Sequence, residues 1–165
     1  MLHILCFGNS LHGDDGVGPA VAARLQATAL PDGARVFDAG VMGLNAMPLF
    51  ENCSHVLLID AMDIGLEPGQ WGFIEADTSF SGLSGIHGGG VGYLLQAVTS
   101  VVSPVPEIAV LGIQIEKVGG FNPVLSDAVT ASLDSVTASV TELAGNYQSH
   151  AAFTCVGNGR CCEET

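Results

Sequence analysis

The chain alternates between short apolar runs and longer segments in which apolar residues recur every three or four positions. The short runs predict strands at residues 2–7, 35–38, 55–59, 72–74 and 108–115. The third and fifth runs are almost continuously aliphatic, which is typical of strands covered on both faces. The longer segments predict helices at residues 16–29, 43–50, 91–101 and 122–144. Because strands and helices alternate, we expect an α/β fold: a three-layer αβα sandwich with an about five-stranded, mostly parallel, twisted sheet and helices on both faces.

Turn and capping residues refine these boundaries. The 72–74 run closely follows Pro68 and Gly69, which favours a short or edge strand. Asn122 and Pro123 are suited to the N-cap and first position of the last helix. Beyond about residue 146 the periodic pattern ends. We therefore predict a single α/β domain at residues 1–146 and a cysteine-containing tail at 147–165 that is disordered or binds a partner.

Charge excludes several classes of partner. The 165 residues include 17 Asp and Glu against 4 Lys and Arg, and the formal net charge is −13. Such a surface repels nucleic-acid phosphates and anionic membranes. No apolar stretch approaches the ~20 residues of a membrane span, and no basic leader is visible. We expect a cytoplasmic, monomeric protein that binds neither nucleic acid nor membrane.

The five cysteines do not form a recognisable framework. Cys6 and Cys53 lie in or beside apolar runs and are expected to be core thiols. Cys155, Cys161 and Cys162 cluster near the end of the chain. In a reducing compartment they are expected to be free thiols, and without a C-x-x-C pair they do not indicate a structural zinc site.

The turn at residues 7–18, FGNSLHGDDGVG, joins the first strand to the first helix and carries two adjacent carboxylates, Asp14 and Asp15. An Asp at a helix N-terminus accepts backbone N–H bonds and is worth roughly 0.5–2 kcal/mol as a cap. One carboxylate suffices for that task. The second is available for acid/base chemistry or metal binding, because the carboxyl edge of an α/β sheet is where such folds place their sites.

Further polar residues are expected at the same edge. Asp60 ends the aliphatic run at 55–59, and Asp38 ends the run at 35–38. His87 lies in a glycine-rich segment before a predicted helix. Several carboxylates and an imidazole together make a plausible divalent-metal site. Each also has a structural interpretation: Asp60 as a loop cap, Asp38 as a turn carboxylate that binds loop amides, and His87 as a cap or surface residue.

Several familiar motifs are absent. The glycine-rich turn at residues 8–13 is followed by Asp rather than the Lys-Ser/Thr of a phosphate-binding loop, and it lacks the G-x-G-x-x-G dinucleotide pattern. The HGGG run at 87–90 is similar to a lipase oxyanion segment, but the chain contains no G-x-S-x-G elbow. An H-E-x-x-H zinc motif is also missing.

The motifs around the opening turn, Asp38, Asp60 and His87 resemble those of the [NiFe]-hydrogenase maturation endopeptidases, over residues 2 to about 144. Residues 4–18 are similar to that family's strand followed by G-N-x-L-x-x-D-[DE]-G-x-G. Residues 38–40 resemble its D-G-G element with Ala in place of one Gly, and 57–62 resemble its aliphatic strand ending in D-A. Residues 66–69 resemble its P-G turn, and His87 its histidine ahead of an apolar helix.

This resemblance implies an endopeptidase that removes a short C-terminal extension from a hydrogenase large-subunit precursor. It also implies that Asp15, Asp60 and His87 bind a divalent metal, nickel already loaded into the precursor, and that no organic cofactor is needed. A site of two carboxylates and one His, with no Cys, suits a metal held mainly by substrate thiolates. Asp38 is our candidate for a general base or a substrate-positioning residue.

Two other functions remain open at this point. Gly8 to Leu11, with Ser10 as nucleophile, resembles the G-D-S-L block of SGNH-type serine esterases. That enzyme class needs a late D-x-x-H, whereas His150 follows Tyr147 at this spacing. The other alternative is a nickel-sensing chaperone that binds the hydrogenase large subunit without cutting it.

Overall fold

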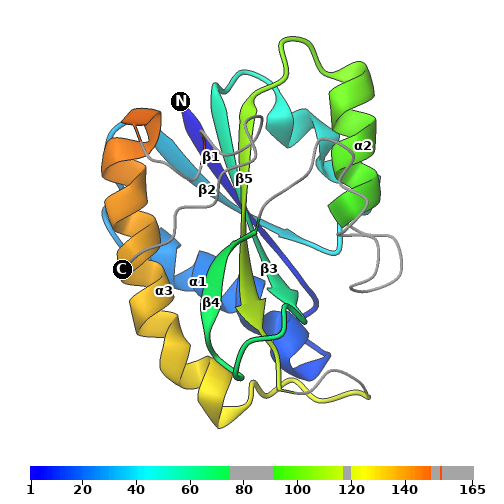
Figure 1. Cartoon of the computed structure of the whole chain (residues 1–165), viewed down its shortest axis with the longest axis vertical. Helices are drawn as coiled ribbons and strands as arrows, with labels where there is room; N and C mark the ends of the chain where they lie inside the picture. Colours follow the sequence, from blue (N-terminus) through cyan, green and yellow to red (C-terminus); the bar gives the residue numbers. More distant parts are fainter. Residues whose placement is uncertain (75–90, 117–119, 150–152, 154–165) are drawn as a thin grey trace.

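A computed structural model of the chain describes residues 1–74, 91–116, 120–149 and 153. Within these residues, strands form one sheet in the order β2-β1-β3-β5-β4 (Figure 1). Their bounds are Leu2–Phe7 for β1, Ala34–Gly40 for β2, His55–Met62 for β3, Trp71–Ile74 for β4 and Glu107–Gln114 for β5. β2, β1, β3 and β5 run parallel, and β4 pairs antiparallel with β5 at the edge. The predicted mostly parallel sheet and the edge position of the fourth strand are confirmed.

Helices cover both faces of the sheet, as the sequence predicted. α1 (Val17–Gln26) and α3 (Asp127–Asn146) pack on one face, and η2 (Gly43–Phe50) and α2 (Val91–Val101) pack on the other (Figure 1). Because strand side chains alternate, Ile4 packs toward α1 and α3 whereas Leu5 packs toward η2 and α2. The structure is therefore a three-layer αβα sandwich.

Two predicted helices differ from the observed ones. Residues 43–50 form a 3-10 helix that contains Pro48, which lacks the N–H needed for a regular α-helix. The last helix begins at Asp127 rather than at Asn122, because Ser126 is the N-cap and its side chain accepts a hydrogen bond from the Val129 N–H at 3.3 Å. Asn122 instead bridges to His12 in the opening turn. The predicted N-cap role of Asn122 is wrong, since a tertiary contact uses its backbone.

The order of the strands creates a topological switch point near the centre of the sheet, between β1 and β3. β1 is flanked by β2 on one side and β3 on the other, so the connection that leaves β1 and the connection that leaves β3 run in opposite directions from their carboxyl ends. In doubly wound folds the crevice at such a point is where ligands bind. The β1–α1 turn and the end of β3 both lie at this crevice, and the Gly8 N–H donates to the Gly40 carbonyl of β2 at 3.1 Å.

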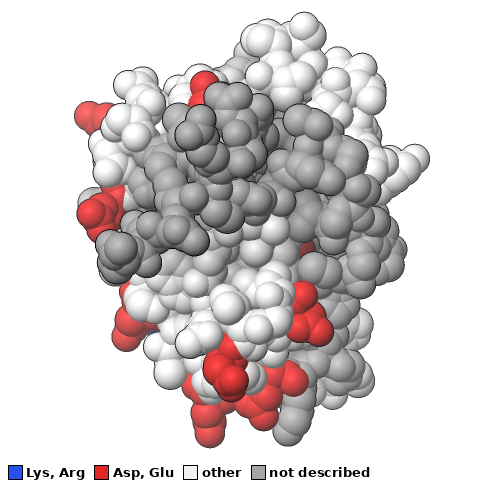
Figure 2. All heavy atoms as spheres, viewed as in Figure 1, with Lys and Arg blue, Asp and Glu red and all other residues white. Residues whose placement is uncertain are grey.

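Acidic side chains gather at the carboxyl end of the sheet. Figure 2 shows them at the lower end of the molecule, where β3 and β5 finish in Figure 1.

Among the described residues, no helix is both long enough and apolar enough to cross a membrane.

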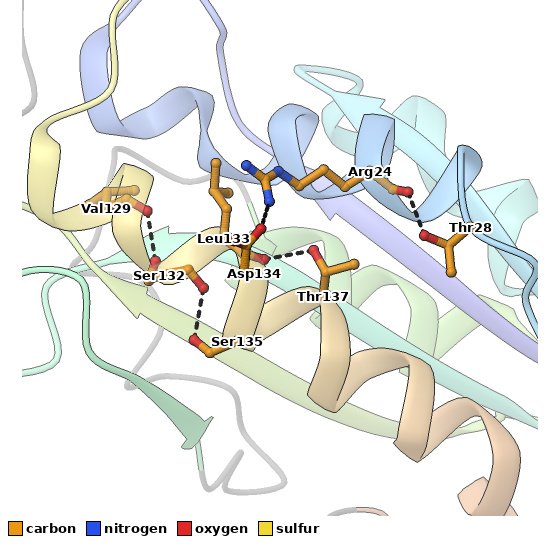
Figure 3. Close-up of polar contacts among 8 residues, drawn as sticks. All are labelled: Arg24, Thr28, Val129, Ser132, Leu133, Asp134, Ser135 and Thr137. Atoms are coloured by element: carbon orange, nitrogen blue, oxygen red, sulfur yellow. Dashed lines mark hydrogen bonds and ion pairs between the residues drawn. The ribbon is translucent and has the colours of Figure 1, made fainter.

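Polar contacts on the outer layer join α1 to α3. Arg24 on α1 forms an ion pair with Asp134 on α3 (Figure 3). Within α3, the Ser132 and Thr137 hydroxyls donate to backbone carbonyls one turn earlier. The Asp134 side chain is 90% exposed, so this pair contributes little to stability. The apolar contacts between the two helices and the sheet hold this layer in place.

Two residues beyond the predicted tail boundary at 146 contact His55 of the domain. Tyr147 lies in η4 (Tyr147–Ser149), and its ring centroid is 4.9 Å from that of His55; the Phe153 ring is at 5.0 Å. The division at residue 146 stays a prediction. Cys155, Cys161 and Cys162 lie outside the described residues.

The two described cysteines are free thiols, as predicted. Cys6 is fully buried in β1, and burial together with the negative charge of Asp38 raises its pKa well above the usual value. Cys53 is half-buried, and burial raises its pKa as well. Since a thiolate is the reactive form, neither cysteine is suited to nucleophilic work in this fold.

Gly18→Ala is expected to destabilise the protein by at least about 3 kcal/mol. A Cβ at Gly18 would lie 1.8 Å from the Phe7 carbonyl oxygen, so α1 would have to move away from β1. Gly145→Ala is the matched control, because a Cβ there meets only Pro31 at 3.9 Å. That variant should be neutral or slightly stabilising, since alanine favours the helix. Urea unfolding of both proteins measures the difference, and equal stabilities would contradict the argument.

Candidate active site

The opening turn positions Asp15 through Asn9. The Asn9 side-chain oxygen accepts the Leu11 N–H at 3.0 Å, and the Asn9 backbone N–H donates to Asp15 Oδ2 at 3.0 Å. The turn continues into a short 3-10 helix, η1 (Gly13–Gly16), whose first turn carries both carboxylates. Asp15 is half-buried, and the turn holds its Oδ2 through the Asn9 N–H.

Gly8 allows the turn to fold back on Asp15. Its φ of +133° lies in a region that L side chains rarely adopt. A Cβ at this position would lie 1.9 Å from the Asp15 carbonyl oxygen. The glycine at the end of β1 is therefore required for the close approach that sets the position of Asp15.

Asp14 is a structural carboxylate that links distant segments. It is 1% exposed. Its Oδ1 accepts the Ser126 N–H at 2.6 Å, and its Oδ2 accepts the Glu116 N–H at 2.8 Å and the Ser126 hydroxyl at 3.0 Å. Both partners belong to the segment between β5 and α3, so Asp14 braces the turn against that segment rather than capping its own helix.

Asp60 is the second carboxylate at the crevice. It is half-buried near the end of β3, and its Oδ1 accepts the Ala61 N–H at 2.9 Å. Burial and the negative charge of Asp15 raise the pKa of Asp60 to about 7. η1 and β3 are in contact, which brings the two predicted site residues to the same part of the sheet edge. A pair of like charges at a crevice favours binding of a proton or a cation.

Asp38 lies at the same edge, at the end of β2. It is exposed, and its Oδ1 accepts the Gly40 N–H at 3.1 Å. This is the turn contact that the sequence offered as one of its two interpretations. A catalytic role for Asp38 stays a prediction.

His87 falls in residues 75–90, which lie outside the described residues. Its predicted role as a metal ligand therefore stays a prediction. In the described ranges, no group of three His, Cys, Asp or Glu side chains is arranged to hold a metal ion. Of the three predicted metal ligands, these ranges contain Asp15 and Asp60, and their role as ligands also stays a prediction.

Gln114 positions the segment after Asp60, and the sequence analysis missed it. Its buried side chain accepts the N–H groups of Ile64 and Leu66 at 2.8 and 3.1 Å, and it donates to Asp63 Oδ1 at 3.2 Å. The signal in the sequence is a lone amide that ends the aliphatic fifth strand. A buried amide in this position needs partners, and the loop after β3 supplies them.

Fold and site together define an α/β protein with two neighbouring carboxylates at the carboxyl edge of its sheet. The sequence model of the hydrogenase maturation protease family matches residues 19–143. The chain belongs to this family, and it is a maturation endopeptidase, a peptide hydrolase. The esterase alternative with Ser10 as nucleophile does not agree with this membership.

Individual relatives agree with the family match. The hydrogenase 3 maturation protease of Escherichia coli K12 is 32% identical over 133 residues, which cover 76% of this chain and 82% of that protein. A putative hydrogenase maturation protease of Methanocaldococcus jannaschii is 39% identical over 72 residues, or 42% of this chain and 47% of that protein. The solved structure of the E. coli hydrogenase maturating endopeptidase HybD is similar in fold, with a TM-score of 0.76, 21% identity and coverage of 90% and 93% of the two chains.

Proposed function

We propose that this protein removes the C-terminal extension of a [NiFe]-hydrogenase large-subunit precursor, and that it recognises the nickel of that precursor through Asp15, Asp60 and His87. The observation that carries the proposal is the pairing of Asp15 and Asp60 at the switch point, with the pKa of Asp60 raised to about 7. The relatives named above are hydrogenase maturation proteases. We place the reaction in the cytoplasm, as the sequence analysis expected.

The chemistry of the pair suits a cation delivered by the substrate. Two neighbouring carboxylates repel each other, and a divalent ion between them relieves that repulsion. Carboxylate oxygens and an imidazole are acceptable ligands for nickel, and substrate thiolates would complete its coordination. The nickel is thus part of the substrate, and binding it aligns the neighbouring peptide bond with the crevice. No organic cofactor is required for this role.

Hydrolysis itself needs an activated water molecule. The water adds to the carbonyl carbon while a carboxylate takes its proton, and that proton then leaves with the amine of the extension. Asp38 is our candidate for this carboxylate, which makes the reaction of the aspartyl type.

The test is incubation of the protein with nickel-loaded and nickel-free precursor, followed by mass spectrometry of both. We expect loss of the C-terminal extension from the nickel-loaded precursor only. A precursor that is bound but remains intact would favour the chaperone alternative. Equal cleavage of both precursors would contradict nickel recognition while leaving the peptidase activity in place.

Asp38→Asn tests the general base. The amide keeps an oxygen for the Gly40 N–H but cannot accept a proton, so the turn is preserved. We expect the processing rate to fall by at least about 100-fold with an unchanged thermal midpoint. Normal cleavage by this variant would rule out the base role and leave Asp38 as a turn residue.

A further inference from the structure

Three apolar side chains are exposed beside the opening turn. Phe121 is 78% exposed, Val124 66% and Leu11 46%. Phe121 and Val124 belong to the segment between β5 and α3, and Leu11 belongs to the β1–α1 turn. We call these three residues the Phe121 patch. Contiguous exposed apolar side chains at a site often mark a surface that binds a partner.

The backbone that carries the Phe121 patch is held in place. The Asn122 N–H donates to the Leu11 carbonyl at 2.9 Å, and the His12 and Asn122 backbones form a parallel bridge. The Val124 N–H donates to the Asn122 side chain at 3.3 Å, and Ser126 is bound by Asp14. The apolar side chains are thus presented to solvent from a fixed support. Such preorganisation lowers the entropy lost when a partner binds.

A second exposed apolar group lies on the other side of the turn. Val41 is 76% exposed, Leu44 44% and Met42 39%, all just after β2. We call these residues the Val41 patch. The Gly8–Gly40 hydrogen bond fixes the end of β2 next to the end of β1.

The sheet order places the carboxylate pair between the two patches. Along the carboxyl edge, β2 leads to the Val41 patch, β1 to Asp15 and to Leu11 of the Phe121 patch, β3 to Asp60, and β5 to Phe121 and Val124. A polypeptide segment that crosses this edge would therefore contact one patch on each side of the carboxylates.

Charge at this edge restricts the chemistry of that segment. Among the described residues, the exposed acidic side chains at or near the carboxyl edge include those of Asp38, Asp63, Glu67, Glu116 and Asp127. Figure 2 shows acidic side chains gathered at this end of the molecule. Acidic segments are repelled here, and a second copy of this chain would bring like charges together.

We propose that the Phe121 and Val41 patches bind apolar side chains of the substrate polypeptide on the two sides of the peptide bond to be cut. The segment recognised is apolar, or apolar and basic, and it carries few acidic residues. This inference rests on the proposed function, because it assigns the occupant of the patches as the precursor. The patches contribute binding affinity for the precursor, whereas the carboxylates take part in cleavage of the peptide bond.

The test is the double variant Phe121→Ser/Val124→Ser, assayed over a range of nickel-loaded precursor concentrations. We expect KM to rise by at least about tenfold, with kcat within twofold of the unaltered protein. Val101→Ser/Val105→Ser is the matched control. Val101 and Val105 are 68% and 44% exposed, but Val101 ends α2 and Val105 lies between α2 and β5, at the amino end of the sheet. The control should have unchanged KM and kcat. Thermal unfolding of both variants verifies the fold.

Direct binding of the precursor separates this inference from the proposed function. If the unaltered protein fails to cut the precursor, the proposed function fails, and a weaker Kd for the patch variant alone would still support the docking surface. A KM and Kd within twofold of the unaltered protein would overturn it, as would a loss confined to kcat. A change in oligomeric state of the patch variant, with precursor binding retained, would instead assign the patch to self-association and also overturn it.

Discussion

Asp15→Ala is expected to abolish processing of the nickel-loaded precursor while leaving the protein folded, whereas Asp14→Ala is expected mainly to destabilise the fold. The two residues are adjacent in sequence and differ in environment. Asp15 is half-buried near the end of β3, and its carboxylate accepts the Asn9 N–H. Removing its carboxylate eliminates a proposed nickel ligand and also the repulsion with Asp60. We expect the rate to fall by at least about 100-fold and the stability to change by about 1 kcal/mol or less.

Asp14, in contrast, is expected to matter for the stability of the fold rather than for the reaction. Its carboxylate is buried and accepts hydrogen bonds from the Glu116 and Ser126 N–H groups and from the Ser126 hydroxyl. Alanine would leave these donors without their acceptor, which is expected to lower the free energy of unfolding by about 3–5 kcal/mol. That is a large share of the 5–15 kcal/mol typical of a domain.

Urea unfolding and precursor cleavage of the two variants measure this asymmetry. Cleavage is compared at a temperature at which both variants are folded. Asp15→Asn is the control for shape, because it keeps an oxygen for the Asn9 N–H and loses the charge; it should be stable and inactive. A stable but inactive Asp14→Ala, together with an active Asp15→Ala, would show that the roles are reversed.

Asp60→Asn is expected to be more stable than the unaltered protein at pH 8 and to lose processing. In the folded protein the pKa of Asp60 is raised from 3.8 to about 7 by burial and by Asp15. In the unfolded chain the carboxyl group returns to its ordinary pKa. Between these two values the folded state holds a proton that the unfolded state has released, so stability falls as pH rises through this window.

This loss of folding stability is complete above pH 7 and absent below the ordinary pKa of a carboxyl group. At about 1.4 kcal/mol for each pKa unit, it amounts to up to about 4 kcal/mol. Because Asn does not ionise, the variant avoids this loss. The difference in free energy of unfolding between variant and unaltered protein should therefore grow from pH 4 to pH 8.

Urea unfolding across this pH range, in the presence of a chelator, measures the difference. The chelator is needed because a bound cation would stabilise the ionised carboxylate. Asp32→Asn removes an exposed carboxyl far from the crevice in sequence and controls for the loss of one negative charge. A difference that stays constant with pH would show that Asp60 is ionised freely in the folded protein.

Much of this architecture could be predicted from local pattern. The strand at Leu2–Phe7 and the helix at Val91–Val101 match their predicted bounds, because continuous apolar runs and helical periodicity are local properties of the sequence. The parallel sheet followed from the alternation of strands and helices. The glycines and carboxylates of the opening turn also predicted a site at the carboxyl edge, and the structure places Asp15 and Asp60 at that edge.

The start of α3 shows the limit of local pattern. Asn122 and Pro123 carry a favourable helix-start signal, yet the helix begins after Ser126. The backbone of Asn122 pairs with the opening turn, and Asp14 binds Ser126 from more than a hundred positions away. Such contacts depend on where the sheet places the two segments, which local propensity does not contain.

The sequence by itself determined which residue types stand at the crevice: two adjacent carboxylates in the first turn and a third after the central aliphatic strand. Only the tertiary structure decided their roles. Burial against the segment between β5 and α3 makes Asp14 a brace, and proximity to β3 couples Asp15 to Asp60. The physical reason is that burial and the distance between charges set the behaviour of a carboxylate, and both are properties of the folded chain.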